Sequence, residues 1–288
     1  MTENTPTYRL NPAHVRRAHH AAGAHYRQYG DIQQEIARRL LSRLDDTKKD
    51  FQNIADLGSG CGFIAELFPQ SGKTLIQTDI DPTFMEPKRA PAMVCDAEHP
   101  LPFADKSFDL VISNLMLPYI TNVRQTLLNA GKILKGDGLL LMSTLGPESF
   151  REFKQTFQVL DLKQQNHTQP LPDVRDWGSL LHGLKFALPV VDRDFITLTY
   201  PDFPTLYTDL KMAAARNLSP LRRHGLMSRD LKRKIEEKYT DLFAKNGEIP
   251  LTLEVIYLHG WRPHKSQQQP LKPGQGQVDL SEILGQET

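Results

Sequence analysis

The residues best suited to chemistry form a glycine-rich loop that an acid precedes. Gly58, Gly60 and Gly62 stand at alternate positions directly after the apolar stretch 53–57, whose fourth residue is Asp56. At the carboxyl end of a strand in an α/β sheet, such a loop lies over a ligand, and glycine lets the backbone approach it closely. The spacing G-x-G-x-G differs from the G-x-G-x-x-G of a dinucleotide site. It suits a ligand with an amino-acid end and a ribose, and S-adenosyl-L-methionine is the obvious one.

A second acid supports this interpretation, since three glycines alone could equally belong to an ordinary loop. Asp79 lies 23 residues after Asp56, where the next strand of such a unit should end and a carboxylate should bind ribose hydroxyls. A short third strand at 92–94 then leads to Asp96, and a proline-rich turn and a buried strand follow within 98–114.

This succession resembles the class I S-adenosylmethionine-dependent methyltransferases over about residues 50–145. The cofactor-binding residues that the resemblance implies are Asp56, Gly58, Gly60, Gly62, Asp79, Asp96, Ala97 and Asn114. Asp79 is expected at the ribose, and Asp96 beside the adenine amino group. The implied fold is α/β: a Rossmann-like, doubly wound seven-stranded sheet with N-terminal helices and a helical lid inserted before the last strand.

The end of the fourth strand, at 113–119, is expected beside the methyl group. Enzymes that methylate an amino group of nucleic acid or glutamine typically carry Asn/Asp-Pro-Pro-Tyr here, whereas this chain reads Asn114-Leu-Met-Leu-Pro-Tyr119. The lack of paired prolines counts against an amine substrate. No catalytic residue is identified, and the candidates near the methyl group are Asn114, Tyr119 and Tyr26. Pro118 and Tyr119 could equally form a helix-start turn with a packed aromatic ring.

The second half of the chain carries a narrower resemblance. The stretches 143–154, 190–202 and 209–211, together with 15–33, are similar to the malonyl-acyl carrier protein O-methyltransferases of biotin synthesis, so that this resemblance spans about residues 12–262. It implies methylation of the free carboxylate of a malonyl thioester. Such a carboxylate is already ionised and needs no general base.

Two other functions stay open. Residues 212–217 depart from the glycine-bearing segment that is usual in that family, and 260–274 is similar to the methyltransferase-like assembly factors of respiratory complex I, which hydroxylate an arginine. The fold alone does not separate these activities. A non-catalytic assembly chaperone is a further alternative, but a scaffold would not need the full set of cofactor-region glycines and acids.

A basic segment suggests a protein partner. Residues 216–238 carry eight Lys or Arg against three acids. This surface could be a solvated helix face. It could also dock an acidic carrier protein at the mouth of the site, where complementary potentials speed encounter. The residues expected to contact malonyl-acyl carrier protein are Arg222, Arg223, Arg229, Lys232 and Arg233.

Composition narrows the class of protein. A net charge of +1 over 288 residues gives no indication of a nucleic-acid partner. Two cysteines, Cys61 and Cys95, make a disulfide framework implausible and fit a reducing cytoplasm. The apolar runs are too short to cross a bilayer, and the N-terminus has no apolar signal core. His19, His20 and His25 have no carboxylate or cysteine at ligand spacing, so no metal site is predicted.

Alternating strands and helices should position these residues. The strands are expected at 53–57, 74–78, 92–94, 108–113 and 138–144, with helices at 63–68 and 123–134 among them. Continuous apolar strands of this kind predict a parallel sheet covered on both faces. The stretches 188–200 and 251–261 should pair as an antiparallel edge, and 163–175 is polar and irregular.

The expected organisation has five parts. Residues 1–45 form an N-terminal helical flap from which Tyr26 or Arg17 reaches inward, and 46–200 form the cofactor-binding core. Two helices, at about 203–216 and 228–245, make a lid within 201–248, and 249–262 supply the final core strand. Residues 263–288 are rich in proline, glycine and glutamine without periodicity, which is typical of a disordered tail.

Overall fold

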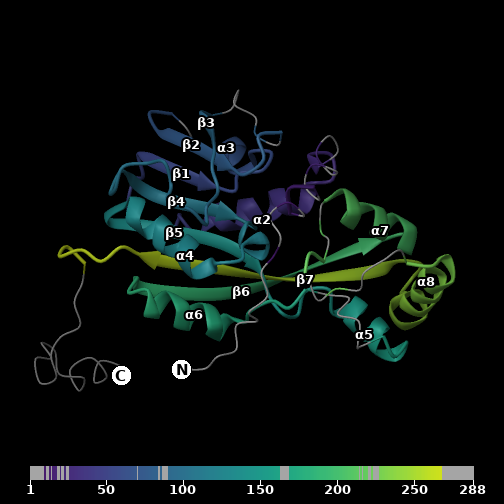
Figure 1. Cartoon of the computed structure of the whole chain (residues 1–288). Coiled ribbons are helices and arrows are strands. Elements are labelled where there is room, and N and C mark those ends of the chain that lie inside the picture. The colour runs from purple at the N-terminus through teal and green to yellow at the C-terminus, as the bar shows by residue number, and fades with distance from the viewer. Residues whose placement is uncertain are drawn as a thin grey trace, which may run out of the picture.

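The glycine loop and the acids belong to one sheet. The computed structural model describes residues 10, 13, 15–17, 20, 23, 26–69, 71–83, 85, 90–162, 169–213, 215, 217–219, 222 and 227–267. Within these residues the sheet has seven strands in the order β3-β2-β1-β4-β5-β7-β6 (Figure 1). The strands are β1 (Asn53–Leu57), β2 (Thr74–Asp79), β3 (Ala92–Val94), β4 (Phe108–Asn114), β5 (Leu134–Leu145), β6 (Ala187–Tyr200) and β7 (Ile249–Trp261).

Strands β1 to β5 are parallel to one another, and β7 runs antiparallel between β5 and β6. Strand β1 is buried at four of its five positions, as expected for a strand that both faces of a sheet cover. The predicted α/β, doubly wound, seven-stranded sheet is therefore confirmed. The predicted antiparallel pairing of the last two strands is also confirmed.

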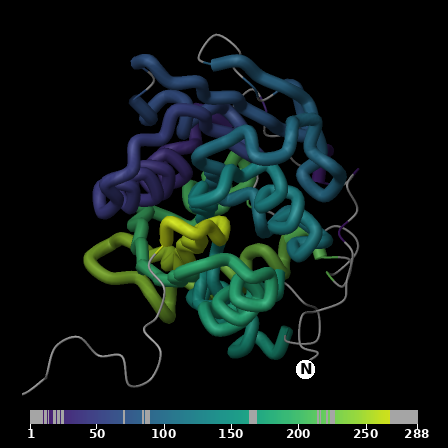
Figure 2. The backbone as a smooth tube through the Cα atoms, turned by 90° about the vertical axis from the view of Figure 1, so that its left-hand side faces the viewer, coloured from purple at the N-terminus to yellow at the C-terminus, as the bar shows by residue number. Residues whose placement is uncertain are grey.

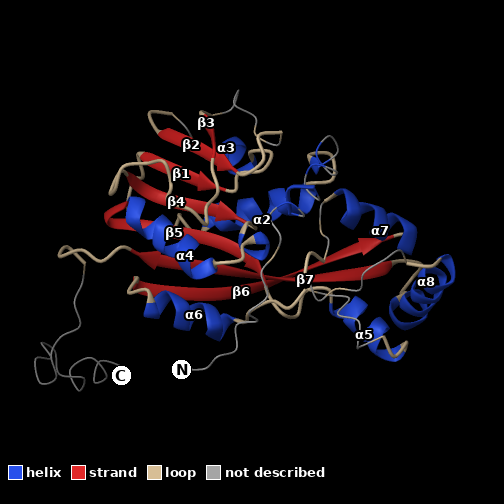
Figure 3. Ribbon diagram, in the orientation of Figure 1, coloured by secondary structure: helices blue, strands red, loops and turns tan. Residues whose placement is uncertain are grey.

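Helices cover both faces of the sheet. They are α2 (Asp31–Ser42), α3 (Phe63–Leu67), α4 (Val123–Ile133), α5 (Arg151–Val159), α6 (Val174–Gly183), α7 (Phe203–Met212) and α8 (Arg229–Phe243), with a short 3-10 helix η1 (Leu117–Tyr119). Figure 3 separates the helices from the strands by colour. In the quarter-turned view of Figure 2 the purple tube of the α2 region and the teal tube of α4 lie on opposite sides of the sheet.

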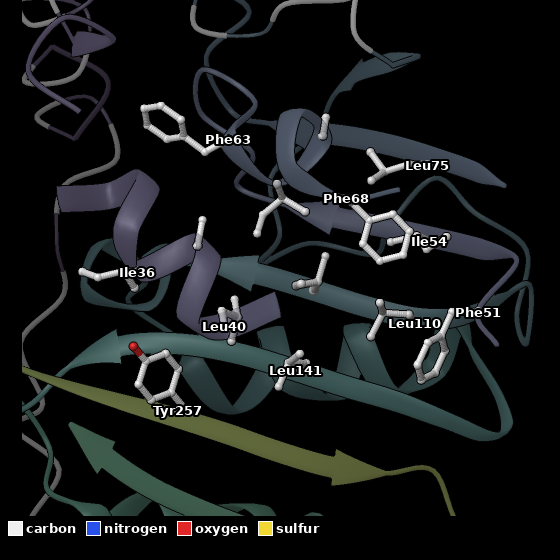
Figure 4. Packing of buried hydrophobic residues seen from close by; sticks show 14 of the residues in the cluster. Ile36, Leu40, Phe51, Ile54, Phe63, Phe68, Leu75, Leu110, Leu141 and Tyr257 are labelled. Carbon is white, nitrogen blue, oxygen red and sulfur yellow. The ribbon is translucent and has the colours of Figure 1, made fainter. Parts of the chain in front are cut away.

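The apolar stripe of α2 anchors the N-terminal side of the core. Ile36 and Leu40, one turn apart, are fully buried and belong to the same cluster as Leu110 and Leu141 of the sheet (Figure 4). Burying each of these side chains stabilises the fold by ~1.5–3 kcal/mol. The helix is thereby fixed against the sheet, and it carries Gln33 toward the carboxyl ends of the strands.

Strands β6 and β7 extend beyond the other strands, and α5, α7 and α8 gather around their far end (Figure 1). A separate apolar cluster forms there, with Phe153, Phe203 and Tyr239 at its centre. The buried carboxylate of Glu152 accepts hydrogen bonds from the backbone N–H and the hydroxyl of Thr252. This contact attaches α5 to β7. It thereby fixes Phe153 and Phe157 of α5 within the apolar cluster.

Three sequence expectations differ from the structure. Helix α6 starts inside the segment that was expected to be irregular, and the helix expected at 203–216 ends at Met212. Residues 263–267 of the expected tail are described, and Gln267 Nε2 donates to Asp137 Oδ1 over 3.0 Å. Residues 268–288 lie outside the described residues.

Candidate active site

The glycine loop is the turn that joins β1 to α3. Gly58, Gly60 and Gly62 have φ angles of 67°, 53° and 78°, in the left-handed region that favours glycine. An added Cβ at Gly58 would lie 2.7 Å from the Met116 side chain. At Gly60 the nearest atom would be Tyr26 Cε1 at 3.9 Å, so this position faces open space. The loop therefore requires glycine for its backbone, and at Gly58 also for room.

Asp79 ends β2 and closes the loop from the other side. Its Oδ2 accepts the backbone N–H of Gly60 over 2.9 Å, and its Oδ1 accepts that of Asp81 over 2.9 Å. Burial raises the pKa of the Asp79 carboxyl, while these backbone donors act in the opposite direction. The carboxylate is thus fixed at the carboxyl ends of the first two strands.

A cavity lies above these strand ends. The predicted cofactor-binding residues that line it are Gly58, Gly60, Asp79, Asp96, Ala97 and Asn114. The three candidate catalytic residues, Asn114, Tyr119 and Tyr26, line it as well. Asp56 and Gly62 are not among the lining residues: Asp56 is buried within β1, and Gly62 immediately precedes α3.

Asp56 has no exposed surface, and neither carboxylate oxygen has a hydrogen-bond partner among the described residues. Burial raises the pKa of this carboxyl well above its usual range, and the nearby Asp79 raises it further. A buried carboxylate without a partner is costly. A cation bound in the adjacent cavity would offset that cost, so the position suits a ligand that carries a positive charge.

Asp96 and Ala97 form the far wall of the cavity, after β3. Asp96 Oδ1 accepts the backbone N–H of Glu98 over 2.9 Å, and Oδ2 lies 3.1 Å from His99 Nδ1. Asn129 of α4 donates through Nδ2 to the Ala97 carbonyl over 3.1 Å. These bonds hold the turn in place, so that an acid and backbone groups are available to a heterocyclic base.

Asn114, at the end of β4, is held in place by two hydrogen bonds of its side-chain amide. Its Nδ2 donates to the Gln33 carbonyl over 2.9 Å, and its Oδ1 accepts the Ser143 hydroxyl over 2.8 Å. The next residue, Leu115, has a φ of 58° and donates its N–H to Ser143 Oγ over 3.0 Å. A left-handed leucine is strained, and such strain is found mainly where a site requires it. The left-handed conformation of Leu115 turns the chain from β4 into η1.

Tyr26 and Tyr119 stand at the same cavity. Burial raises the pKa of Tyr26 well above its usual range and the neighbouring Tyr119 adds to this effect, although a hydrogen bond with the Gln33 side chain lowers it. Burial also raises the pKa of Tyr119 to about 12. Both phenols are therefore neutral at physiological pH and can donate hydrogen bonds.

Tyr119 also lines a second, larger chamber of about 470 Å³. The walls of this chamber come from η1, the end of β5, α5, α7 and the residues that follow α7. They are mostly apolar and aromatic, with Phe150, Phe153, Phe157 and Leu210 among them. Tyr119 is thus common to both cavities, which adjoin each other at this residue.

Sequence reasoning missed several lining residues. Leu10 and Val15 line the cofactor cavity and form a small cluster with Leu218, against which Tyr119 packs. Of the two residues expected to reach inward, Tyr26 lines the cavity, whereas Arg17 is exposed and its Nε donates to the Ala13 carbonyl of the same segment. Leu10 and Val15 could have been found as apolar residues within a basic stretch of the sequence. Leu115 and Met116 also line the cavity, within the stretch 113–119 that was expected beside the methyl group.

The basic segment is only partly available to a partner. Arg233 forms ion pairs with Asp230 and Glu237, over 2.9 and 3.0 Å. Lys232 lies over the Tyr207 ring at 4.7 Å, and Arg229 is exposed. Arg222 donates to the Ser219 carbonyl over 3.1 Å. Arg223 lies outside the described residues.

The described part of the chain contains no group of three or more His, Cys, Asp or Glu placed to hold a metal ion. It also contains no helix that is long and apolar enough to cross a membrane.

Comparisons with known proteins agree with this geometry. A family model described as a methyltransferase domain matches residues 55–142. A putative methyltransferase from Bacillus halodurans has a similar structure, with a TM-score of 0.55, 16% identity, and coverage of 79% of this chain and 99% of that one. The YcgJ protein from Bacillus subtilis covers the same shares, with a TM-score of 0.53 and 16% identity. These two likenesses concern the fold.

Among the curated relatives, the malonyl-[acyl-carrier protein] O-methyltransferase of Laribacter hongkongensis is 31% identical over 96% of this chain and 98% of its own length. A malonyl-[acyl-carrier protein] O-methyltransferase 1 of Coxiella burnetii is 34% identical over 86% of each chain. A mitochondrial arginine-hydroxylase of Danio rerio is 28% identical over 89% of this chain and 83% of its own.

The sheet, the glycine loop and the acid-lined cavity therefore define a class I S-adenosylmethionine-dependent methyltransferase, and S-adenosyl-L-methionine is the cofactor. The described residues fit that cofactor: Gly60 leaves open space beside Tyr26, and the partnerless carboxylate of Asp56 favours a bound cation. Within this class the chain belongs to the family of malonyl-[acyl-carrier protein] O-methyltransferases.

Proposed function

We propose that this chain methylates the free carboxylate of a malonyl thioester carried on acyl carrier protein, as an early step of biotin synthesis. The names of its relatives support the proposal. Esterification masks the negative charge of the malonyl group, so that enzymes of chain elongation can handle it as an ordinary acyl chain.

The observation that carries the proposal is the lack of a poised general base in the described walls of the cofactor cavity. The carboxylates of Asp79, Asp96 and Glu98 all accept backbone N–H groups. The phenols of Tyr26 and Tyr119 have raised pKa values. A nucleophile used here must therefore arrive already in its reactive form, and a carboxylate does so because it is ionised at neutral pH.

When bound, the cofactor supplies an electrophilic methyl group on a positively charged sulfur. The contribution of the chain is to hold the carboxylate in line with the methyl group and to exclude water from the site. The backbone of Gly58 and the open space at Gly60 would receive the amino-acid end, Asp79 would hold the ribose and Asp96 the adenine. Tyr119 stands between the cavity and the chamber, where its neutral phenol can donate a hydrogen bond to a carboxylate without competing for its charge.

The chamber also suits the carrier. Its apolar walls, which include Phe150 and Phe157, can hold the thioester end of an acyl arm out of water. Lys232 lies over Tyr207, which lines the same chamber, and Arg229 is exposed at the start of α8. These two cations are the part of the basic segment best placed to meet an acidic carrier protein.

The test is incubation of the full-length enzyme with methyl-labelled S-adenosylmethionine and malonyl-acyl carrier protein, followed by mass analysis of the acyl group. We expect a single methyl ester that mild alkali removes. Acetyl-acyl carrier protein, which has no free carboxylate, is the matched control and should stay unlabelled. An alkali-stable methyl group, or hydroxylation of a peptide arginine without ester formation, would contradict the proposal and favour the activity named for the Danio rerio relative.

A further inference from the structure

One face of α7 forms a wall of the chamber. Tyr207, Leu210 and Lys211 are three and four residues apart on this helix, and all three line the chamber. Helix positions at this spacing lie on the same face. Opposite, Phe150 and Phe153 line it from the start of α5, whose position the buried Glu152 fixes.

Lys211 is the only charged side chain among the described residues that line this chamber. No ion pair within the described part of the chain engages its ammonium group, in contrast to Arg233, Lys234 and Lys238 on α8. Since the chamber has no acid among its described lining, its electrostatic potential favours an anion. The Lys211 side chain is exposed at the mouth of the chamber, so the apolar walls shield its charge only in part.

We propose that Lys211 binds the free carboxylate of the substrate, an inference that rests on the proposed function. The chamber and the cofactor cavity share Tyr119, so an anion drawn to Lys211 is brought to the side where methyl transfer takes place. Transfer of the methyl group forms a carbon–oxygen bond and breaks the carbon–sulfur bond. The sulfonium charge and the carboxylate charge disappear together.

The same ion pair explains selectivity and release. A malonyl group presents a carboxylate to Lys211, whereas an acetyl group presents none. Once the carboxylate has become a neutral ester, the pairing is lost and the product is held less tightly than the substrate. Lys211 is therefore a binding and specificity residue, and it takes no proton.

The experiment measures binding without turnover. Malonyl-N-acetylcysteamine and acetyl-N-acetylcysteamine are titrated calorimetrically into the full-length enzyme loaded with S-adenosylhomocysteine. Wild-type enzyme should bind the malonyl compound more tightly than the acetyl one. Lys211→Met should lower affinity for the malonyl compound several-fold and leave the acetyl compound unchanged, because only an exposed charged contact is removed. Lys211→Arg should retain the preference.

Lys234→Met is the matched control, because this lysine lies on α8 and pairs with Asp230. It should leave both affinities unchanged, and thermal unfolding should show that all variants are folded. A malonyl preference that survives Lys211→Met would overturn the inference, as would a wild-type enzyme without any preference. Weaker binding of 4′-phosphopantetheine alone would assign Lys211 to the phosphate instead. Methyl ester formation, measured separately, decides the proposed function independently of these affinities.

Discussion

The backbone N–H of Gly60 donates to Asp79 Oδ2 over 2.9 Å, and this bond joins the loop after β1 to the end of β2. Two residues 19 positions apart in the chain thereby act as one wall of the cofactor cavity. The loop presents backbone to the ligand, and the acid presents its carboxylate. A change in either residue should alter cofactor binding, but for different physical reasons.

Asp79→Ala should weaken cofactor binding by removing a charged hydrogen-bond acceptor. Each ribose hydrogen bond to that carboxylate contributes ~1.5–3 kcal/mol at most, and less where water replaces it. The loss of the bond to Gly60 should also loosen the loop. Calorimetric titration with S-adenosylhomocysteine measures the effect. Asp105→Ala, at an exposed acid outside the cavity, is the control. If both variants bound S-adenosylhomocysteine equally well, Asp79 would not be a cofactor-binding residue.

Gly60→Val should abolish measurable cofactor binding, because the branched side chain would enter the open space beside Tyr26. The control is Gly72→Val. Gly72 has a φ of 71° and an added Cβ there has no atom within 4 Å, so it lies in the same left-handed region away from the cavity. Both variants should lose ~1–2 kcal/mol of folding stability to backbone strain. If Gly72→Val impaired binding as much as Gly60→Val, strain rather than occupied space would be the cause.

Asp56→Asn should stabilise the cofactor-free enzyme and weaken cofactor binding. The folded-state pKa of Asp56 is raised by burial. Its contribution to stability is therefore complete below about pH 4, the pKa of an unfolded aspartate, and is lost as pH rises through the folded pKa. Asparagine cannot ionise and escapes that loss. The variant should unfold at a higher urea concentration than the wild type at pH 8, and the difference should be smaller at pH 5.

Urea titrations of the wild type and of Asp56→Asn at several pH values check this dependence. Calorimetry with S-adenosylmethionine should show weaker binding, since the buried negative charge beside the bound cation has gone. A difference in stability that did not change with pH would mean that Asp56 stays neutral throughout. A destabilised variant at pH 8 would mean that the carboxylate has a partner in the folded enzyme.

The cofactor loop could be predicted from the sequence because its chemistry is local. Alternate glycines after a strand specify positive φ angles, and the three φ values agree with that requirement. The spacing from Asp56 to Asp79 follows from one strand, one loop and one helix. Helix α6 could also have been found, since Asp173 and Asp176 form a capping box at its start.

The chamber could not be predicted in this way. Two of its lining residues, Phe153 of α5 and Tyr207 of α7, are far apart in the sequence and meet at the far end of the long strands β6 and β7. Charge counting also leaves the contacts at α8 open. The segment is basic by composition, and Arg233 and Lys234 both form exposed ion pairs with Asp230 one turn away. Composition gives the number of charged residues, whereas the folded structure determines which neighbours each of them contacts.

The rate of methyl transfer should be constant between about pH 6 and 9. A malonyl carboxyl has a pKa near that of an ordinary acid side chain, about 4, so it is ionised throughout this range. The pKa of Tyr119 is raised to about 12, so its phenol stays neutral. Single-turnover formation of the methyl ester, corrected for hydrolysis of preformed ester, gives the profile. A tenfold rise in rate per pH unit would reveal a general base and would count against a carboxylate nucleophile.

The basic segment beside the chamber should steer the carrier protein. Arg229→Glu combined with Lys232→Glu should raise the KM for malonyl-acyl carrier protein several-fold at low salt, because each rim charge contributes ~0.2–1 kcal/mol. The effect should fall mainly on the association rate and fade as salt increases. Turnover of malonyl-N-acetylcysteamine should change little, since methyl transfer is positioned by the cavity.

Lys132→Glu combined with Lys185→Glu provides the control. It makes the same change in net charge on a groove lined by α4 and the end of α6, where both lysines are exposed. That double variant should leave the KM for the carrier unchanged. An equal rise in KM for both double variants would mean that overall charge, rather than this surface, steers the carrier. Loss of activity on the carrier-free thioester in Arg229→Glu with Lys232→Glu would instead show that these side chains support α7 and the chamber wall, because Lys232 packs over Tyr207.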